Sequence, residues 1–274
     1  MILLLGVQGQ LGGALQRVVP PDTCCWGRRD LDLRQVKEIA PKIIAAQPKI
    51  VINTAAMTDV DACEREPAAA RAVNGEAPGE LARACIKIGA ALVHVSTDYV
   101  FGRDEARNVP YVESDAPAPV NMYGQSKLQG EEAVQDSGCA YLIIRTCGLY
   151  GGEEVKQNYV ERVIERARRR QEIRATVDQI YSPTSVGELA PAIWRLIQEQ
   201  RRGILHAANT APVSRYAFTR AIVEICGLAV PVVEARRADF GGAARPGYSA
   251  LDSERIALKD YMSDWKTALA NYLS

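Results

Sequence analysis

The stretch Ile2-Leu-Leu-Leu-Gly6-Val-Gln-Gly9-Gln-Leu-Gly12 decides the fold class of this chain of 274 residues. Its first four residues form a short apolar run of the kind found in strands that are buried on both faces of a parallel sheet. The glycines follow the spacing G-x-x-G-x-x-G and precede a predicted helix over residues 12–19. Glycines between a first strand and a first helix allow a tight turn, close approach of the backbone to a pyrophosphate and close helix packing. A tight turn without a ligand is the alternative that this motif leaves open.

Apolar runs and helical patterns alternate along the first half of the chain. This βαβ spacing predicts an α/β fold, a Rossmann-like doubly wound parallel sheet followed by a smaller C-terminal domain. The further predicted strands cover residues 24–26, 50–53, 90–96 and 141–145, and the predicted helices between them cover residues 36–46, 68–90 and 123–133.

The sequence pattern changes after Tyr150, where a polar, loop-like stretch begins, and this change predicts two domains. We expect a dinucleotide-binding Rossmann domain at residues 1–145 and a mainly substrate-binding domain at residues 146–274. A segment of the second half, about residues 176–200, is expected to return to the Rossmann domain. Further helices are predicted over residues 159–170, 187–200 and 215–225.

The charge balance excludes several classes of protein. Lys and Arg together number 33, as do Asp and Glu, so the formal net charge is +0. Proteins that bind nucleic acids or anionic membranes need an excess of basic charge to meet phosphates. We therefore expect neither nucleic acid nor a membrane as a partner. The two histidines, His94 and His206, are too few for a His-rich site, so no metal is expected.

The cysteines indicate a reducing compartment. Seven cysteines, an odd number without a Cys-x-x-Cys pair, are typical of reduced thiols rather than of a disulfide framework or a zinc site. The longest apolar runs are much shorter than the roughly 20 residues that span a bilayer. The N-terminus lacks a basic region followed by an apolar one, so no signal peptide is expected. The sequence therefore predicts a cytoplasmic protein.

Tyr123-Gly-Gln-Ser-Lys127 places a tyrosine and a lysine on one face of a predicted helix. A tyrosine with a pKa of about 10 is a poor acid or base at neutral pH. A neighbouring ammonium stabilises the phenolate, so Lys127 is expected to lower the pKa of Tyr123. About one βα unit earlier, Thr97 lies at the carboxyl end of a predicted strand, where doubly wound folds bind their ligands. Its hydroxyl can meet a substrate carbonyl beside Tyr123.

The end of the second predicted strand indicates which dinucleotide binds. An NAD site usually has an acid here for the ribose 2′-hydroxyl, whereas an arginine suits a 2′-phosphate. Arg28 and Arg29 follow this strand and therefore favour NADP. Asp32 and Leu33 come next, near the expected adenine. Two exposed arginines in a loop are the alternative reading, and NAD stays open as a cofactor.

Several strings spread from residue 1 to about residue 255 identify a family. Together they resemble the dTDP-4-dehydrorhamnose reductase family of the extended short-chain dehydrogenase/reductase superfamily. The strings Ser-Thr-Asp-Tyr-Val-Phe and Asp-Gln-x-x-Ser-Pro-Thr are specific to this branch. The matching segments are Asn53-Thr-Ala-Ala56 with Asp59, Asp61 and Glu64, Ala72-Val-Asn74, residues 96–101, Asn121 to Lys127, Arg145-Thr146, Asp178 to Thr184 and Ala244-Arg-Pro246.

The resemblance implies an oxidoreductase that delivers hydride from a nicotinamide to C4 of a dTDP-linked 4-keto sugar and gives dTDP-L-rhamnose. Its catalytic residues would be Thr97, Tyr123 and Lys127, with Thr97 and Tyr123 on the 4-keto oxygen and Tyr123 as the proton donor. Lys127 would also hold the nicotinamide ribose. The cofactor-binding residues would be Gly6, Gly9, Gln10, Leu11, Gly12, Arg28, Arg29, Asp32, Leu33, Asn53, Ala55, Ala56, Tyr123 and Lys127.

The same resemblance places Thr97, Asp98, Tyr99 and Gly148 around the sugar, and Arg245 at the nucleotide end of the substrate. The family often has a tryptophan where this chain has Gly148, which predicts a larger sugar pocket. A reductase of another nucleotide 4-keto sugar is therefore one alternative. A non-catalytic NADP-binding subunit that resembles the regulatory beta subunit of methionine adenosyltransferase is another. A homodimer also stays open.

Overall fold

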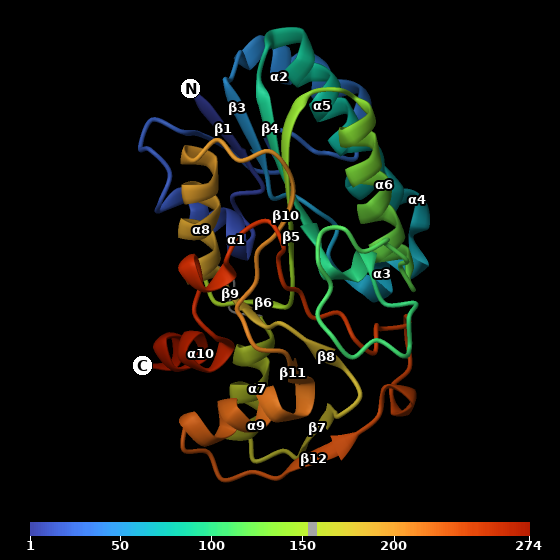
Figure 1. Ribbon diagram of the computed structural model, residues 1–274, viewed down its shortest axis with the longest axis vertical. Helices are drawn as coiled ribbons and strands as arrows, with labels where there is room; N and C mark the ends of the chain where they lie inside the picture. The colour runs from blue at the N-terminus through green and yellow to red at the C-terminus, as the bar shows by residue number, and fades with distance from the viewer. Residues whose placement is uncertain (153–157) are drawn as a thin grey trace.

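The computed structural model describes residues 1–152 and 158–274 and has two lobes, one above the other in the view of Figure 1. The upper lobe is a parallel sheet with helices on both faces. Its strands are β1 (Ile2–Leu5), β2 (Cys24–Trp26), β3 (Ile50–Asn53), β4 (Ala91–Thr97), β5 (Ala140–Thr146) and β10 (Gly203–His206). Its helices are α1 (Gln10–Gln16), α2 (Val36–Ala46), α3 (Val60–Arg65), α4 (Pro67–Ala70), α5 (Ala77–Ile88), α6 (Met122–Asp136) and α8 (Val186–Gln198).

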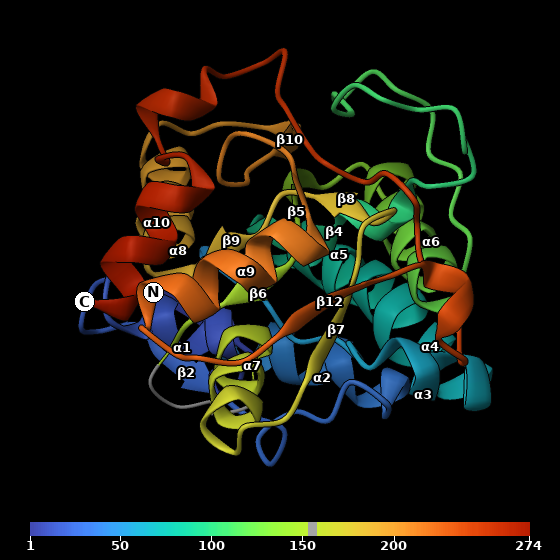
Figure 2. The ribbon, with the colours of Figure 1, turned by 90° about the horizontal axis from the view of Figure 1, so that it is seen from below.

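As far as the structure describes it, the lower lobe has three α-helices and pairs of short strands. In the view from below, α7, α9 and the pair β7–β12 lie in front of the large sheet (Figure 2). The helices are α7 (Tyr159–Arg168), α9 (Arg215–Ile225) and α10 (Trp265–Leu273). The strands are β6 (Leu149–Tyr150), β7 (Ile173–Thr176), β8 (Ile180–Tyr181), β9 (Thr184–Ser185), β11 (Val213–Ser214) and β12 (Val232–Ala235). No helix among the described residues is long and apolar enough to cross a membrane.

The six strands of the large sheet lie in the order β10-β5-β4-β3-β1-β2, and every neighbouring pair is parallel. The chain moves outward in one direction from β1 to β2 and in the other from β3 to β10. The order therefore reverses between β1 and β3, which is where doubly wound sheets bind ligands at the carboxyl ends of their strands. The predicted α/β fold with a doubly wound sheet is confirmed.

Strand β1 shows why the sheet is apolar on both faces. Leu4 packs with α1 and α8 in one hydrophobic cluster, together with Leu15 and Ile193. Its neighbours Leu3 and Leu5 point the other way and pack with α2 and α5. Successive side chains of a strand alternate between faces, so a strand covered by helices on both sides needs an uninterrupted apolar run.

The helix predicted over residues 68–90 is interrupted. It consists of α4, a π-helical segment η1 (Arg71–Glu76) and α5. The wide turn brings the backbone of Asn74 against α6, where a Cβ on Gly130 would lie 2.1 Å from the Asn74 carbonyl oxygen. The Asn74 side chain in turn donates to the Ser126 hydroxyl at 3.1 Å and accepts from the Met57 N–H at 2.8 Å. Apolar periodicity does not report such a turn, because it arises from packing against a distant helix.

Strand β10 was not predicted as a strand. It is reached only after the chain has passed through the lower lobe, and it pairs with β5 from Gly203↔Leu142 to His206↔Arg145. Helix α8 precedes it and packs on the same face of the sheet as α1. The chain therefore returns to the upper lobe after β9.

Replacing Gly130 with Ala should lower the free energy of unfolding by about 1–3 kcal/mol, since the new methyl group would overlap the Asn74 carbonyl. Urea unfolding followed by circular dichroism measures this change. Gly187→Ala in α8 is the matched control, because its Cβ would meet only the Ser185 hydroxyl at 3.4 Å. We expect the control to keep or slightly raise the stability, by up to about 1 kcal/mol. Equal stability of the two variants would contradict the close packing of η1 on α6.

Candidate active site

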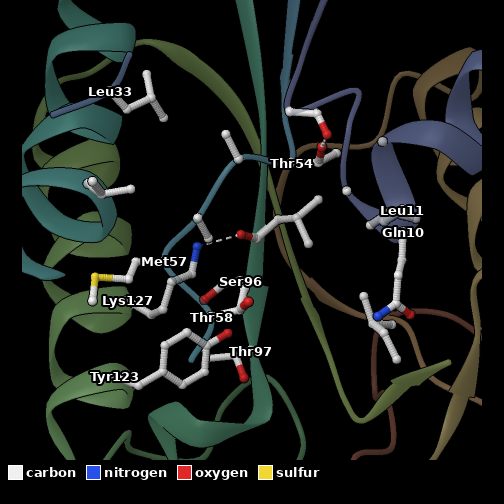
Figure 3. Close-up of a pocket in the computed structure, with 18 of the residues that line it drawn as sticks. Gln10, Leu11, Leu33, Thr54, Met57, Thr58, Ser96, Thr97, Tyr123 and Lys127 are labelled. Atoms are coloured by element: carbon white, nitrogen blue, oxygen red, sulfur yellow. Dashed lines mark hydrogen bonds between the residues drawn. The ribbon is translucent and has the colours of Figure 1, made fainter. Parts of the chain in front are cut away.

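A cavity of about 760 Å³ lies at the carboxyl ends of the strands, and Figure 3 shows part of its lining, from Gln10 of the glycine turn to Tyr123. Its lining extends into the lower lobe, to Tyr181 and Arg215. Its size is within the range of ligand-binding pockets. Three of the residues predicted for binding, Arg29, Asn53 and Arg245, are not among the described residues that line it. The predicted residues that do line it are Gly6, Gly9, Gln10, Leu11, Gly12, Arg28, Asp32, Leu33, Ala55, Ala56, Thr97, Asp98, Tyr99, Tyr123, Lys127 and Gly148.

The glycine turn leaves no room for side chains. Gly6 has a φ of +84°, and a Cβ on it would lie 2.6 Å from the Ala55 nitrogen. A Cβ on Gly12 would lie 2.1 Å from the Gly6 carbonyl oxygen. The turn can therefore approach a ligand with bare backbone at the start of α1. Beside it, Gln10 Oε1 is buried and has no hydrogen-bond partner, so a ligand at this turn would find an available polar atom.

The residues after β2 form a positive end of the cavity. Arg28 and Arg34 line it together with Asp32. The Asp32 carboxylate accepts from Arg34 at 2.5 Å, and this hydrogen bond holds the pKa of Asp32 below its usual value. The Asp32 carboxylate is therefore already bound by Arg34 and is not free to accept from a ribose hydroxyl. Arg29, the next residue along the chain, is exposed and lies off the lining.

Tyr123 and Thr97 meet in the cavity from different elements. Tyr123 is in the first turn of α6, which begins after Asn121 because the Asn121 side chain accepts from the Gly124 N–H. Thr97 ends β4 (Figure 3). Burial raises the pKa of Tyr123, and a hydrogen bond with Thr97 opposes that shift. The expectation that Lys127 lowers the pKa of Tyr123 is therefore wrong, because desolvation of the phenol raises this pKa. The phenol carries its proton at neutral pH.

Asp98 fixes the Thr97 hydroxyl rather than remaining free for a ligand. Its Oδ1 accepts from Thr97 Oγ1 at 3.0 Å. Its Oδ2 accepts from Cys147 Sγ at 3.0 Å and from Ser249 Oγ at 2.6 Å. Burial raises the pKa of Asp98, and these hydrogen bonds oppose the rise. Three donors thus converge on a buried carboxyl group directly behind the Thr97–Tyr123 pair.

The Lys127 amine is held against strand β4. Its Nζ donates to the Val95 carbonyl at 2.7 Å, a contact drawn in Figure 3, and lies 3.2 Å from His94 Nε2. His94 Nδ1 lies 3.1 Å from Asn53 Nδ2, so Asn53 supports the lysine from behind the cavity rather than lining it. Burial lowers the pKa of Lys127 to about 8, against the opposing charge of Glu131. The amine therefore remains mostly charged at neutral pH.

One helical turn after Lys127, Glu131 forms an ion pair with Arg145 of β5 at 2.7 Å. The side chains are 0% and 2% exposed, so both charges are fully buried. Ser96 of β4, which lines the cavity, also donates to Glu131. The pair therefore ties α6 to the two strands that border the site. Sequence reasoning did not find Glu131, because a lone acid on a helix gives no signal of its partner.

The space beside Gly148 is filled rather than open. A Cβ on Gly148 would lie 2.6 Å from the ring of Tyr181, which lines the cavity. A tyrosine from β8 thus occupies the space next to the glycine, and the enlargement of the sugar pocket relative to a tryptophan at this position stays a prediction. Arg215 also lines the cavity and was missed, because it looked like one more charge at the start of an amphipathic helix. Arg245, in contrast, pairs with Asp61 at 2.9 Å.

Comparison with known proteins gives consistent matches. Residues 1–274 match the protein family described as RmlD substrate binding domain. A dTDP-4-dehydrorhamnose reductase from Mycobacterium tuberculosis (strain H37Rv) is 38% identical over 285 residues, which cover 100% of this chain and 92% of that protein.

Solved structures agree in fold as well as in sequence. A dTDP-4-dehydrorhamnose reductase from Clostridium acetobutylicum has a TM-score of 0.93 and 33% identity, covering 99% of this chain and 98% of that one. A dTDP-4-dehydrorhamnose reductase from Bacillus anthracis, solved in complex with NADP, has a TM-score of 0.92 and 34% identity, covering 99% and 97%. The similarity therefore spans both lobes.

Replacing Glu131 with Gln should lower the free energy of unfolding by about 3 kcal/mol, because it leaves the Arg145 charge buried without a counter-charge. Urea unfolding at neutral pH measures the loss. Glu132→Gln is the matched control, since its side chain is the exposed neighbour on the same helix, and its effect should stay within about 0.5 kcal/mol. Similar effects of the two substitutions would contradict a dominant role for the buried pair.

Proposed function

The chain belongs to the dTDP-4-dehydrorhamnose reductase family, and we propose that it reduces the 4-keto group of dTDP-4-dehydro-L-rhamnose with NADPH, giving dTDP-L-rhamnose. One observation carries the proposal: a single cavity joins the glycine turn to the Thr97–Tyr123 pair. A site for nucleotide phosphates and a protonated phenol thus share one enclosure. The named relatives and their coverage of the whole chain support the choice of substrate.

The residues present fit NADP(H). The glycine turn lines the cavity, Gly6 and Gly12 are packed so closely that neither could carry a Cβ, and Gln10 Oε1 lacks a partner beside them. Arg28 and Arg34 suit a 2′-phosphate, because Asp32 is bound to Arg34 and is not free for a ribose hydroxyl. A relative was solved with NADP. When bound, this cofactor supplies the hydride. NAD(H) is the alternative ligand of the same cradle.

Tyr123 is assigned as the proton donor. As negative charge develops on the C4 oxygen, the phenol transfers its proton to that oxygen. Thr97 can turn its hydroxyl proton from Asp98 to the same oxygen, because the Asp98 carboxyl keeps its bonds from Cys147 and Ser249. The transient phenolate is then stabilised by the ammonium of Lys127, whose pKa of about 8 leaves it mostly charged at neutral pH.

The upper lobe would bind the cofactor, and the lower lobe would bind most of the substrate. We assign cofactor binding to residues 1–145 together with α8 and β10, since α8 is the part of the expected returning segment of about residues 176–200 that packs on the large sheet. We assign substrate binding mainly to the rest of residues 146–274. The packing of α8 beside α1 supports the return. Gly148, Gln179 and Tyr181 of the second half line the cavity, which supports a sugar site between the lobes. Asp98 and Tyr99 would flank the sugar from the first half.

Replacing Tyr123 with Phe should reduce turnover by roughly 100- to 10,000-fold, since the proton donor is lost. The affinity for NADPH should change little. Loss of NADPH absorbance with dTDP-4-dehydro-L-rhamnose measures turnover, and NADPH fluorescence measures binding. Tyr261→Phe serves as the control, because its hydroxyl binds Glu199 away from the cavity.

Near-normal turnover of the Tyr123 variant would contradict the donor role. Tight NADPH binding by the unaltered protein with no turnover of this sugar would instead favour the non-catalytic alternative.

Replacing Arg28 with Ala should lower the preference for NADPH over NADH by roughly 10-fold or more, because a charge-assisted hydrogen bond to the 2′-phosphate is lost. The ratio of kcat/KM for the two cofactors measures the preference. Arg29→Ala is the control, since Arg29 lies off the cavity lining and should leave the ratio nearly unchanged. An unchanged ratio in the Arg28 variant would refute the phosphate contact.

A further inference from the structure

Arg215 brings a positive charge into the cavity from the lower lobe. It is the first residue of α9, and its backbone N–H donates to the Gln179 carbonyl at 3.0 Å. Its guanidinium lies between two tyrosine rings, with Cζ 4.4 Å from the centroid of Tyr159 and 4.6 Å from that of Tyr181. The rings hold the plane of the guanidinium in one orientation, so its donors are arranged before any ligand arrives.

In the part of the chain that the structure describes, the surroundings of this charge are aromatic rather than acidic. No carboxylate forms an ion pair with Arg215 within residues 1–152 and 158–274, and its Nε is buried without a hydrogen-bond partner. Burial raises the pKa of Tyr181 well above its usual value, so that ring remains neutral. Burial opposes the charged form of Arg215, but the surrounding tyrosines outweigh it and raise the pKa of the guanidinium. A guanidinium that stays charged and lines the cavity suits a negatively charged ligand.

Arg215 lies close to the sugar site but apart from the glycine turn. Tyr99 connects the two regions: its ring packs against that of Tyr123 at 5.8 Å between centroids, and its hydroxyl accepts from Gln179 at 3.4 Å. Gln179 therefore links Tyr99 with Arg215, because its carbonyl accepts from the Arg215 N–H while its side chain donates to the Tyr99 hydroxyl. In a pyranose, C4 and the anomeric carbon are at opposite ends of the ring. A sugar with its 4-keto group at Tyr123 can thus direct its anomeric substituent past Tyr99.

We propose that Arg215, clamped between Tyr159 and Tyr181, binds the diphosphate of the nucleotide-sugar substrate. This assignment rests on the proposed function. A planar guanidinium matches two phosphate oxygens with two parallel hydrogen bonds. Gly148 contributes indirectly, because a side chain there would displace the Tyr181 ring that forms one wall of the clamp. The alternative arginine, Arg245, is already paired with Asp61.

The test compares thymidine 5′-diphosphate with thymidine, using calorimetry on the protein saturated with NADP⁺. Arg215→Gln should weaken binding of the diphosphate by roughly 10- to 100-fold and leave thymidine binding within about 2-fold, because only a charge-assisted contact is lost. NADPH affinity should not change. Arg220→Gln is the matched control on the same helix, where the arginine is exposed and pairs with Glu224.

Equal weakening of both ligands, or no weakening of either, would overturn the assignment. So would a selective loss of diphosphate affinity in Arg245→Gln but not in Arg215→Gln. If Arg215→Gln does not fold, Arg215→Lys decides by the same comparison, since an ammonium cannot make the paired contact and should still bind the diphosphate several-fold more weakly. Turnover of dTDP-4-dehydro-L-rhamnose by the unaltered protein tests the reductase function separately from the ratio of the two affinities.

Discussion

The geometry of the active site depends on the buried ion pair between Arg145 of β5 and Glu131 of α6. Helix α6 carries both Tyr123 and Lys127, whereas Thr97 is on β4, so the helix must be held in one position against the sheet. Two buried charges that satisfy each other tolerate little displacement, because separation would leave each one unpaired. Ser96 adds a bond from β4 to the same carboxylate. Together with the hydrogen bond from Lys127 to the Val95 carbonyl, the ion pair holds the catalytic residues of α6 against β4.

The fold was largely predictable because its signals are local. The apolar run of β1, the glycine turn and the spacing of Tyr123 and Lys127 all lie within a few residues, and each retains its meaning in the folded protein. The features that were missed join distant segments. The π-helical turn at Asn74 exists to pack against α6, and the wall beside Gly148 comes from Tyr181. No periodicity in the sequence encodes either contact.

The balanced charge of the chain conceals unequal surroundings of its arginines. The sequence analysis predicted that Arg28 and Arg29 bind the cofactor phosphate and that Arg245 lies at the nucleotide end of the substrate. Arg28 does line the cavity, while Arg29 is outside its lining and Arg245 is neutralised by Asp61. Arg215 carried no signal, since an arginine at the start of an amphipathic helix usually faces water. Its surroundings of tyrosine rings are set by residues from α7 and β8, far away in the sequence.

The late return of the chain to β10 has a consequence for synthesis on the ribosome. Strand β5 is an edge strand until Gly203–His206 has emerged and paired with it. Until then the backbone N–H and C=O groups on this edge of Leu142 to Ile144, whose side chains are apolar, are open to pairing with other nascent chains, which is the hazard of any exposed edge. The first half of the protein thus carries all of the glycine turn and the Tyr123–Lys127 pair, yet its sheet lacks the last of its six strands. Truncated products ending before β10 are the species that chaperones must protect.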